Sequence, residues 1–580
     1  MSNIIKNLDT SQPLYCDTET NQFFSKIRLV QVFQEHWDEA QLFDIRDVNL
    51  RDVYEDMKQC TTVWHNYSYD GACFCNDLGI KENPFPFFED TLILSKLTLY
   101  KYLESFSLDN CLEYVHGYDV YGADEIEKKT MQKSFVSTKS KDMSKMDLTE
   151  KQLQYAANDV FYLPKLFHMV KHKTEDFVYQ LDKTFLRTCL VWQQNGLPVD
   201  QKRLLQFKED TQRAIDEQTV LLPEGLNINS PKQVRIAIGS EQSDDLGLAI
   251  LGAEGNEIAK AVREKRKMVK RMNFLDRYSF DRVRGFFTPT AVSGRARCQG
   301  SSVKPYDGTD NLMQIPRELK GLFGFDEKDP RYLVYADFAQ LELRTVCADS
   351  GDPVLEKLFK EDNDLHIYAA TQIFNKKAED ITKQERFIAK MCNFSLLYLS
   401  GWKTFKNILV KLAGSAPADR EIEQTVAKWR VLYPGIKAWH KKVSSQGGGF
   451  GSKKPMFGST LNGRNYKATK VTDLAGVQNQ GLGAEVAKLA MHYFFKKEPD
   501  AKLLVFIHDS YVLEAKDLEE GKKLAHSLAD SMVEAWFECT KNAKVKDLPI
   551  PTQALVGKNF GDIDGKGIYE YEYMNEGLAK

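Results

Sequence analysis

The sequence lacks the patterns typical of zinc proteins, secreted proteins and membrane proteins. Its ten cysteines are scattered, with no CxxC and no Cys/His pairs at zinc-ligand spacing, which excludes a structural zinc site. No apolar run approaches the roughly 18 residues of a membrane span. The first residues, MSNIIKNLDTSQ, resemble neither a signal peptide nor a transit peptide. We therefore expect reduced thiols and a cytoplasmic protein that does not enter a membrane.

Net charge and composition exclude further classes. The 580 residues include 79 Lys plus Arg and 82 Asp plus Glu, for a net charge of −3, so any polyanion site must be local. With 42% hydrophobic and 28% charged residues, the chain fits neither a disordered nor a fibrous protein. At about 150 residues per domain, its length predicts roughly four folded units.

Residues 1–175 are predicted to form an α/β layer. The segments PLYCDTE, IRLVQVFQ and AQLFDI within residues 13–45, and the later TTVWHN, have the apolar content of strands, with helical patterns between and after them. A Lys/Ser-rich stretch from Lys128 to Lys145 is interpreted as a solvated loop, with nucleic-acid contact as the alternative.

Residues 176–285 are predicted to be helical, and their last part is strongly basic. From Lys260 to Arg284 there are ten Lys/Arg and three acids, a local charge of +7. A solvated helix usually intersperses its charges, so a phosphate-facing surface is the preferred interpretation. The candidate nucleic-acid contacts here are Lys265, Arg266, Lys267, Lys270 and Arg271.

Two strands and a hairpin are predicted beyond this region. YLVYADF (332–338) and LLVFIHDSYVLEA (503–515) have strand character, and long helical segments lie between them. SSQGGGFGSKK is interpreted as a flexible loop without the spacing of a phosphate-binding P-loop. The following STLNGRNYKA carries an Asn-Gly turn between strand-like arms, which indicates a hairpin.

A first set of acids predicts a metal-dependent nuclease. LYCDTET places Asp17 and Glu19 two residues apart on a strand, so both carboxylates face one side. HNYSYD supplies Asp70 at the start of a helix, and YAANDV supplies Tyr155 and Asp159 on one helical face. Converging carboxylates can hold two Mg²⁺ ions for phosphodiester hydrolysis, while a phenol orients the attacking water. Each motif alone is weak, and a solvated acid is an equal interpretation of any one of them.

A second set predicts nucleotidyl transfer. Asp337 ends one apolar strand and Asp509 lies in a turn between apolar arms, as a two-metal phosphoryl-transfer site requires. Between them, Arg386, Lys390 and Phe394 recur every fourth residue. One helical face could then bind a triphosphate and stack on a base, and Lys390 could protonate the departing pyrophosphate. An ordinary charged surface is the alternative interpretation of this helix alone.

The order of the first set resembles the DEDD superfamily of 3′–5′ exonucleases, in its tyrosine-containing branch. DTLILSKLTLY near Asp90 and SLDNCLEYVHG from Ser107 add to the match. The resemblance implies a ribonuclease H-like fold. It also implies that Asp17, Glu19, Asp70 and Asp159 are metal ligands and that Tyr155 positions the catalytic water.

Nearly the whole chain resembles the DNA polymerases of family A. The segments that carry the resemblance are QQNGLPVD, NINSPKQV, TPTAVSGRAR, NLMQIPR, DFAQLELR, DLHIYAA, the helix from Arg386 to Tyr398, YPGIKAW, GAEVAKLAM, HDS and VGKNFGDID. The resemblance implies that Asp337 and Asp509 are catalytic metal ligands and that the Phe338 carbonyl adds a third contact. The implied nucleotide-binding residues are Arg386, Lys390, Phe394, Tyr398, Glu342 and His508.

Several of these implied roles are specific. Glu342 would close the space of a ribose 2′-hydroxyl, Tyr398 would border the nascent base pair, and His508 would contact the primer end. Arg295 and Gln480 would donate hydrogen bonds to minor-groove acceptors that all four base pairs share.

The chain departs from the family pattern at several positions. Ser510 stands where the third polymerase motif usually has Glu, and Glu514 lies too far along to replace it. Ser395 and Leu399 replace usual glycines, which would stiffen closure of the fingers, and Gly476 replaces a usual minor-groove Asn. Both essential aspartates are intact.

Together these features predict an α/β and α+β multidomain protein, with a ribonuclease H-like exonuclease followed by a right-hand polymerase. The expected domains are exonuclease (1–175), linker and thumb (176–285), first part of the palm (286–345), fingers (346–475) and C-terminal part of the palm (476–580). Because Asp17 lies so near the first residue, no 5′ nuclease domain is expected before it.

The expected activity is template-directed DNA synthesis with 3′–5′ proofreading, in a replicative and phage-encoded enzyme. It would use two Mg²⁺ per active site, with Mn²⁺ as a substitute. The expected partners are primer-template DNA and dNTPs, with a helicase and a single-strand-binding protein in addition, and the enzyme is expected to be a monomer in the cytoplasm of a bacterial host. The alternatives are a repair or gap-filling polymerase, and an exonuclease whose C-terminal half binds DNA without polymerising.

Overall fold

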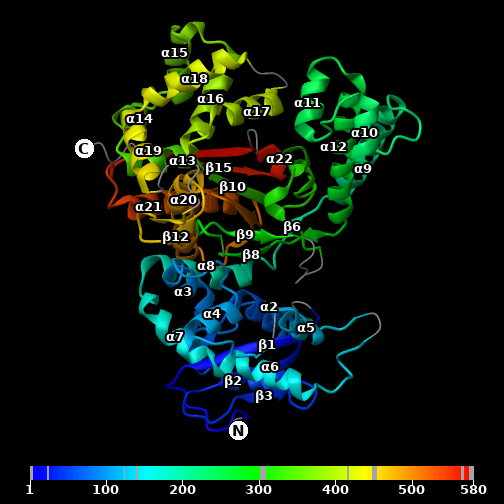
Figure 1. The fold of residues 1–580 in the computed structure, drawn as a ribbon, viewed down its shortest axis with the longest axis vertical. Helices are drawn as coiled ribbons and strands as arrows, with labels where there is room; N and C mark the ends of the chain where they lie inside the picture. Colours follow the sequence, from blue (N-terminus) through cyan, green and yellow to red (C-terminus); the bar gives the residue numbers. More distant parts are fainter. Residues whose placement is uncertain are drawn as a thin grey trace.

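A computed structural model describes most of the chain. The described residues are 4–22, 25–122, 125–138, 141–289, 291–300, 308–413, 417–446, 454–563 and 567–573. The glycine-rich loop predicted from Ser444 lies largely outside these ranges. Figure 1 shows the N-terminal domain as one lobe, in blue and cyan, below a larger lobe built from the rest of the chain. No helix in the described ranges has the length and apolar content needed to cross a bilayer.

The N-terminal lobe is built on a five-stranded sheet in the order β3-β2-β1-β4-β5. β1 and β2 are antiparallel, whereas β4 runs parallel to both β1 and β5. The strands are β1 (Leu14–Gln22), β2 (Ser25–Phe33), β3 (Gln41–Asp44), β4 (Thr62–Trp64) and β5 (Phe88–Asp90). The helices are α1 (Leu50–Met57), α2 (Tyr67–Leu78), α3 (Thr91–Thr98), α4 (Leu108–His116), α5 (Glu125–Ser134), α6 (Glu150–Phe161) and α7 (Leu163–Val170). The strands predicted within residues 13–45 and at TTVWHN are all present.

One prediction in this lobe was wrong. The first part of the Lys/Ser-rich stretch from Lys128 is not a loop but belongs to α5. Lys128 pairs with Asp119 at 2.9 Å, and its ammonium lies 5.4 Å from the centre of the Tyr121 ring. These tertiary contacts hold a segment whose composition alone favours solvation.

A helical hairpin forms the thumb of the upper lobe. After α8 (Phe177–Trp192), the long helices α9 (Gln201–Val220) and α12 (Glu257–Arg277) pack together. The shorter α10 (Pro231–Ile238) and α11 (Asp245–Ala253) lie at the tip, around a small core of their own. The short strands β6 (Leu197–Pro198) and β7 (Arg282–Val283) pair at the base of the hairpin.

The palm is a second five-stranded sheet, in the order β13-β14-β10-β15-β16. Its strands are β10 (Tyr332–Phe338), β13 (Lys502–Ile507), β14 (Ser510–Ala515), β15 (Thr552–Gly557) and β16 (Tyr569–Tyr573). The long helices α20 (Val471–Lys497) and α21 (Leu518–Thr540) pack together, and α21 contacts β10. The other palm elements are α13 (Leu341–Ser350), α22 (Phe560–Ile563), β8 (Phe286–Thr288) and β9 (Arg297–Gln299). The two strands predicted from sequence, 332–338 and 503–515, correspond to β10 and to the β13–β14 hairpin.

The fingers rise above the palm in Figure 1. They comprise α14 (Pro353–Lys360), α15 (Leu365–Phe374), α16 (Lys383–Ser395), α17 (Trp402–Ala413), α18 (Asp419–Leu432) and α19 (Pro434–Gln446). The predicted hairpin at the Asn-Gly turn is present as β11 (Met456–Ser459) and β12 (Asn465–Ala468). It lies against the N-terminal lobe, because Phe457 packs edge-on against Tyr100 and β12 contacts α3.

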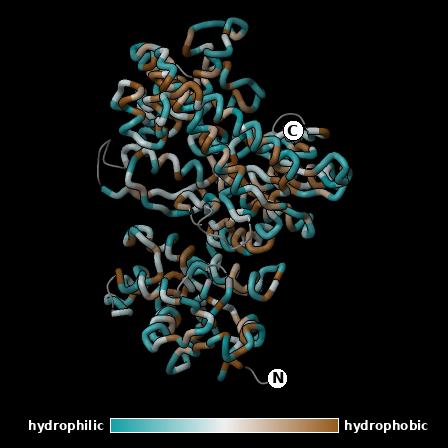
Figure 2. The backbone as a smooth tube through the Cα atoms, turned by 90° about the vertical axis from the view of Figure 1, so that its right-hand side faces the viewer, coloured by the Kyte–Doolittle hydropathy of each residue, from teal (hydrophilic) through white to brown (hydrophobic). Residues whose placement is uncertain are grey.

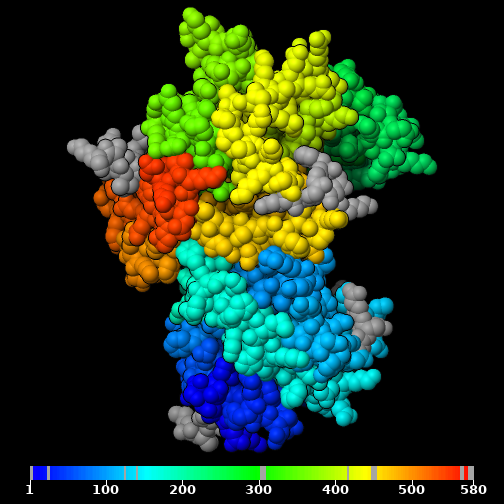
Figure 3. Space-filling model, turned by 60° about the vertical axis from the view of Figure 1, so that its left-hand side comes forward, coloured from blue at the N-terminus to red at the C-terminus, as the bar shows by residue number. Residues whose placement is uncertain are grey.

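Separate apolar cores stabilise the two lobes. One core surrounds the N-terminal sheet, and a larger one joins α8, the palm and the fingers. Figure 2 shows the hydrophobic segments in brown inside each lobe. In Figure 3 the blue and cyan N-terminal lobe meets yellow and orange segments of the larger lobe. The larger lobe therefore has one shared core, and the N-terminal sheet has another, to which α8 also contributes.

Candidate active sites

Three predicted acids of the N-terminal lobe come together. Asp17 and Glu19 lie on the same face of β1, and Asp159 approaches them from α6. One carboxylate oxygen from each lies within 4.8 Å of the others. The Gln31 amide donates to Asp17 at 3.1 Å from the neighbouring strand. The structure thus confirms that the two acids of the Asp-x-Glu motif face the same side of a strand.

Asp70 sits beside this cluster rather than inside it. It lies in the first turn of α2, as predicted, and its Oδ1 accepts a 2.6 Å hydrogen bond from the Thr18 hydroxyl. Its proximity to Asp17 raises its pKa, after the larger effect of burial. Asp70 is therefore next to the three-acid group but is oriented by Thr18.

The electrostatics of these acids indicate a cation site. Burial, followed by repulsion from neighbouring carboxylates, raises the pKa of Asp17 and of Glu19 well above the usual range. Burial raises the pKa of Asp159 to about 7. Buried carboxylates at this separation cannot all ionise unless a positive charge joins them. Oxygen-only donors suit hard divalent cations such as Mg²⁺.

Two tyrosines flank the cluster. Tyr155 lies one turn before Asp159 on α6, as predicted, and stacks on Tyr121 with ring centroids 5.1 Å apart. The Tyr121 hydroxyl donates a short hydrogen bond to Asp159. Sequence reasoning missed Tyr121, because the loop that carries it has no periodic pattern. A phenol 38 residues before an acid gives no local signal of this contact.

The two palm aspartates also meet. Asp337 is near the end of β10, and Asp509 lies in the turn between β13 and β14, two strands of the same sheet. The preceding His508 has a left-handed backbone with φ of 57°, which shapes this tight turn. Burial, followed by repulsion from Asp337, raises the pKa of Asp509 to about 7. The Tyr335 hydroxyl donates to Asp337 at 3.0 Å.

Neighbouring residues clarify the third polymerase motif. The Ser510 hydroxyl donates to the Ile507 carbonyl across the turn, so it closes the turn. Glu514 lies at the opposite end of β14 and binds Arg282 at 2.6 Å. Glu514 therefore does not replace the carboxylate that is missing at Ser510, in agreement with the expectation from the sequence. Phe338 ends β10 directly after Asp337, and the role of its carbonyl stays a prediction.

A polar network surrounds Glu342. Arg295 donates to one Glu342 oxygen at 2.5 Å, and the Tyr398 hydroxyl donates a short hydrogen bond to the other. The Asn479 amide donates to Tyr398 at 3.0 Å. Three predicted residues thus form one group. The family resemblance pointed to the neighbouring Gln480, which is half-buried on α20. Asn479 was therefore missed.

The predicted nucleotide helix is α16. A capping box between Thr382 and Glu385 starts it, which fixes the first turn before Arg386. Arg386 binds Asp364 at 2.7 Å, and the Lys390 ammonium lies 5.9 Å from the centre of the Phe394 ring. Arg386, Lys390 and Phe394 therefore share a face, as predicted from their spacing.

Leu399, four residues beyond the end of α16, carries backbone strain. Leu399 has φ of 61°, where a side chain costs about 1–2 kcal/mol per residue relative to the right-handed region. This is one of the two positions where the family usually has glycine. Leu399 therefore adopts a backbone conformation that glycine would adopt with less strain.

The thumb cations divide into two groups. Arg266 binds the carbonyls of Ile228 and Ser243, and the Arg271 guanidinium packs 5.2 Å from the centre of the Phe207 ring. These two arginines hold the thumb together, so we leave them out of the proposed DNA contacts. Lys267 and Lys270 are exposed and Lys265 is half-buried. The sequence could not distinguish the two groups, because the carbonyls that bind an internal arginine lie in loops that are remote in sequence.

A buried ionic network was not predicted. Asp182 on α8 accepts hydrogen bonds from Arg464 at 2.8 Å and from Lys488 at 2.6 Å. Glu485 on α20 accepts from Thr460 and lies 3.5 Å from Arg464. All four charged residues are buried. The network joins α8, the β11–β12 hairpin and α20, which lie far apart in sequence.

Comparisons with known proteins agree with this geometry. DNA polymerase I of Aquifex aeolicus is 29% identical over 615 residues, covering 96% of this chain and 97% of that protein. DNA polymerase I of Pseudomonas aeruginosa is 26% identical over 413 residues, and the match covers 64% of this chain and 42% of that protein. A solved structure, the POL domain of Pol1 from M. smegmatis in complex with DNA primer-template and dNTP, has the same fold. Its TM-score is 0.73 at 16% identity, over 95% of this chain and 96% of that one.

Two family models divide the chain between them. The model described as 3′–5′ exonuclease matches residues 1–175, which hold the three-acid cluster. The model described as DNA polymerase family A matches residues 201–562, which hold Asp337 and Asp509. The chain therefore belongs to DNA polymerase family A and carries an N-terminal 3′–5′ exonuclease domain.

Proposed function

We propose that this enzyme replicates DNA, extending a primer from dNTPs and removing mispaired ends with its own exonuclease. The observation that supports this most is the presence of two separate acid sites on two domains. Asp17, Glu19 and Asp159 belong to one lobe, and Asp337 and Asp509 belong to the other. An enzyme with a single activity would have no use for both.

Two Mg²⁺ ions are proposed for each site, with Mn²⁺ as a substitute. The residues fit such ions: the donors are carboxylates, and burial, followed by repulsion between neighbouring acids, raises the pKa of Asp509 and Glu19. Asp337, Asp509 and the Phe338 carbonyl would hold metal in the palm, and the four N-terminal acids would hold it in the exonuclease. The metals would neutralise charge on the reacting phosphate.

The remaining chemistry is assigned to side chains of the fingers and of α6. Arg386 and Lys390 would bind the triphosphate, and Lys390 would donate a proton to the departing pyrophosphate. Phe394 and Tyr398 would border the incoming nucleotide, with Glu342 closing the space below its sugar. In the exonuclease, Tyr155 would orient the attacking water.

DNA contacts are proposed from the thumb and the palm. Lys265, Lys267 and Lys270 would bind backbone phosphates without regard to sequence. Arg295 and Gln480 would probe the minor groove, and His508 would contact the primer end. The proposal extends to a monomeric, phage-encoded enzyme working in a bacterial cytoplasm, with a helicase and a single-strand-binding protein as partners.

Mutation should separate the two activities. We expect Asp17→Ala with Glu19→Ala to abolish 3′ degradation while preserving extension, and Asp509→Ala to do the reverse. Primer extension and release of labelled 3′ nucleotides, both with Mg²⁺, measure the two outcomes. A folded Asp17/Glu19 variant that loses both activities would contradict the two-site assignment.

Product length tests the replicative role. On a long primed template, a replicative enzyme should give products of many hundreds of nucleotides, whereas a gap-filling enzyme should stop after short additions. A wild-type protein that degrades primers but never extends them would instead support an exonuclease with a DNA-binding C-terminal half.

A further inference from the structure

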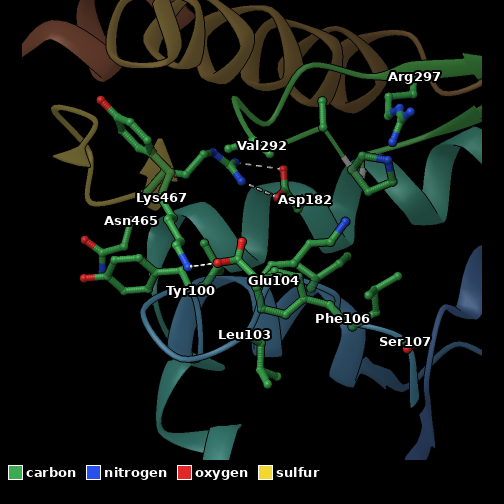
Figure 4. A pocket seen from close by; sticks show the side chains of 18 of the residues that line it. Tyr100, Leu103, Glu104, Phe106, Ser107, Asp182, Val292, Arg297, Asn465 and Lys467 are labelled. Carbon is green, nitrogen blue, oxygen red and sulfur yellow. Dashed lines mark hydrogen bonds and ion pairs between the residues drawn. The ribbon is translucent and has the colours of Figure 1, made fainter. Parts of the chain in front are cut away.

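Two polar networks include side chains of α20, and they differ in what they hold. The first is ionic and includes Asp182 of α8, which accepts two hydrogen bonds from Arg464 (Figure 4). The second consists mainly of neutral side chains and ends on Glu342, the residue proposed to close the space of a ribose 2′-hydroxyl. Asn479 is the member that α20 supplies, and it is only 4% exposed. Any effect of Asn479 on a nucleotide must therefore pass through its neighbours.

The hydrogen bonds of the second network run in one direction. The Thr345 hydroxyl donates to the Asn479 side-chain oxygen, and the Asn479 amide donates to the Tyr398 hydroxyl at 3.0 Å. The Tyr398 hydroxyl in turn donates to one carboxylate oxygen of Glu342. Hydrogen bonds aligned in this way polarise and strengthen one another, and a charged final acceptor strengthens the last of them.

The Asn479 amide determines where the Tyr398 proton goes. A phenol has a single hydrogen to donate, whereas an amide nitrogen can only donate. Because Asn479 presents its nitrogen to the Tyr398 oxygen, the Tyr398 proton is directed to Glu342. Burial, followed by the charge of Glu342, raises the pKa of Tyr398, so the hydroxyl keeps the proton that it donates.

The Glu342 carboxylate is held from both sides. Arg295 binds one oxygen at 2.5 Å, and Tyr398 binds the other. The Glu342 side chain is 26% exposed, so part of it is open to a ligand. Without the Tyr398 bond, only Arg295 would fix this side chain, and the freed oxygen could accept a hydrogen bond from a 2′-hydroxyl. Loss of the bond would therefore favour ribonucleotides in two ways.

We propose that Asn479 is a positioning residue for sugar selection, which directs the Tyr398 hydroxyl onto Glu342 and so holds Glu342 where it excludes a ribose 2′-hydroxyl. Thr345 supports this role by binding the oxygen of the Asn479 amide. The inference rests on the proposed function, in which Glu342 closes the space below the sugar. It adds a residue that selects the sugar without touching the substrate.

The test is the ratio of kcat/KM for a dNTP to kcat/KM for the matching rNTP. Primer extension with Mg²⁺ measures it in the full-length enzyme, with Asp17→Ala and Glu19→Ala present so that the product is not degraded. We expect Asn479→Leu, which is similar in size and has no amide, to lower the ratio about two- to tenfold, the value of one neutral hydrogen bond. The fall should come from faster use of the rNTP. A misfolded fraction lowers both values equally and cancels in the ratio.

Variants of two neighbouring positions make the result specific. Thr345→Val removes the hydroxyl with little change of shape and should also lower the ratio, whereas Thr345→Ser keeps the hydroxyl and should retain the wild-type ratio. Gln478→Leu is the matched control on α20, because the Gln478 amide donates to Asp349 at 2.7 Å. Its ratio should equal that of the wild type.

A double variant tests whether Asn479 acts through Tyr398. Tyr398→Phe keeps the ring and removes the hydroxyl, so adding Asn479→Leu to it should lower the ratio no further. If the two substitutions instead lower the ratio independently, Asn479 does not act through the Tyr398 hydroxyl and the inference is overturned.

The remaining outcomes separate this inference from the function on which it rests. An unchanged ratio in Asn479→Leu, together with a fall in Glu342→Ala, would overturn the positioning role and leave the proposed role of Glu342 intact. An unchanged ratio in Glu342→Ala would overturn both. A wild-type protein that never extends a primer would overturn the proposed DNA synthesis itself.

Discussion

At the scale of single residues, Phe394 has the sharpest expected effect. It lies on the same face of α16 as Lys390, partly buried, with the His366 ring 5.8 Å away. Its side chain offers no hydroxyl to the sugar of an incoming nucleotide. If Phe394 borders the sugar as proposed, a dideoxynucleotide would leave a polar partner of the missing 3′-hydroxyl unsatisfied.

We expect Phe394→Tyr to remove most discrimination against dideoxynucleotides. A tyrosine hydroxyl would restore one hydrogen bond to a charged group, worth on the order of 1.5–3 kcal/mol, or roughly ten- to over a hundredfold in selectivity. Single-turnover incorporation of both substrates, in an exonuclease-deficient background, measures the ratio. Equal selectivity in the two proteins would mean that Phe394 does not face the sugar.

A second residue-scale prediction concerns Tyr121. Its hydroxyl orients Asp159 and its ring supports Tyr155, so Tyr121→Phe should keep the stacking and lose only the hydrogen bond. We expect a fall of about tenfold or more in 3′ degradation and a shift in the Mg²⁺ midpoint, since a hydrogen bond to a charged group is worth about 1.5–3 kcal/mol. Tyr118→Phe, on an exposed ring, is the control. Extension should not change in either variant, and an unchanged Mg²⁺ midpoint in Tyr121→Phe would contradict the role.

Residue-scale prediction succeeded where the signal is local. Asp17 and Glu19 share a strand face, and Tyr155 and Asp159 share a helix face, so their spacing was enough to group them. Tyr121 and Asn479 could not be found this way, because their partners are remote in sequence. The partners of Arg266 could not be found for the same reason. A positive charge in a basic run does not reveal that internal carbonyls bind it.

At the scale of elements, α20 contains glycines with opposite surroundings. A Cβ added at Gly476 would meet only Tyr398, at an ordinary 3.8 Å. A Cβ at Gly481 would lie 2.5 Å from the Thr460 side chain. The family difference at Gly476 therefore leaves space beside Tyr398, whereas Gly481 allows the hairpin to approach the helix.

Gly476→Ala should consequently stabilise the protein and Gly481→Ala should destabilise it. Helix propensity alone favours alanine by about 0.5–1 kcal/mol at either position. At Gly481 the clash should cost about 1–3 kcal/mol, as overpacking does, and this cost should exceed the gain in helix propensity. The two variants can be compared by chemical denaturation. Equal stabilisation of both would mean that the hairpin and α20 do not pack as closely as described.

The prediction of strands and of the hairpin was accurate because turn residues clearly mark the ends of these elements. β10 has the predicted limits, and the Asn-Gly turn correctly indicated the β11–β12 hairpin. α5 was missed because its Lys/Ser-rich composition resembles a loop, and its order depends on the Lys128–Asp119 pair and the Tyr121 ring. The placement of the hairpin against the exonuclease lobe also depends on tertiary contact and has no sequence signal.

At the scale of the whole molecule, the buried ionic network around Asp182 connects the palm to α8. The pKa of Asp182 is lowered: burial raises it, but Arg464 and Lys488 together lower it more. A depressed carboxylate pKa contributes stability above its unfolded value, and this stability is lost as the pH falls through the folded value. The contribution of the Asp182 carboxylate should therefore persist until the solution is acidic.

Asp182→Asn should cost about 3–5 kcal/mol of unfolding free energy, because it leaves buried cations without their charge partner. Glu534→Gln, which breaks the exposed pair between Lys497 and Glu534, should cost about 0–1 kcal/mol. Denaturant unfolding of both variants at neutral pH provides the comparison. Similar small losses would show that the network adds little to stability.

The ion pair between Arg386 and Asp364 has a kinetic consequence for the whole catalytic cycle. If Arg386 binds the triphosphate as proposed, an incoming nucleotide would have to displace the Asp364 carboxylate, and all four nucleotides would face that competition equally. An exposed pair of about 0–1 kcal/mol weakens binding at most about fivefold and does not alter the choice among bases. On this proposal, re-forming the pair would favour release of pyrophosphate, so weaker binding of the triphosphate would be accompanied by faster turnover.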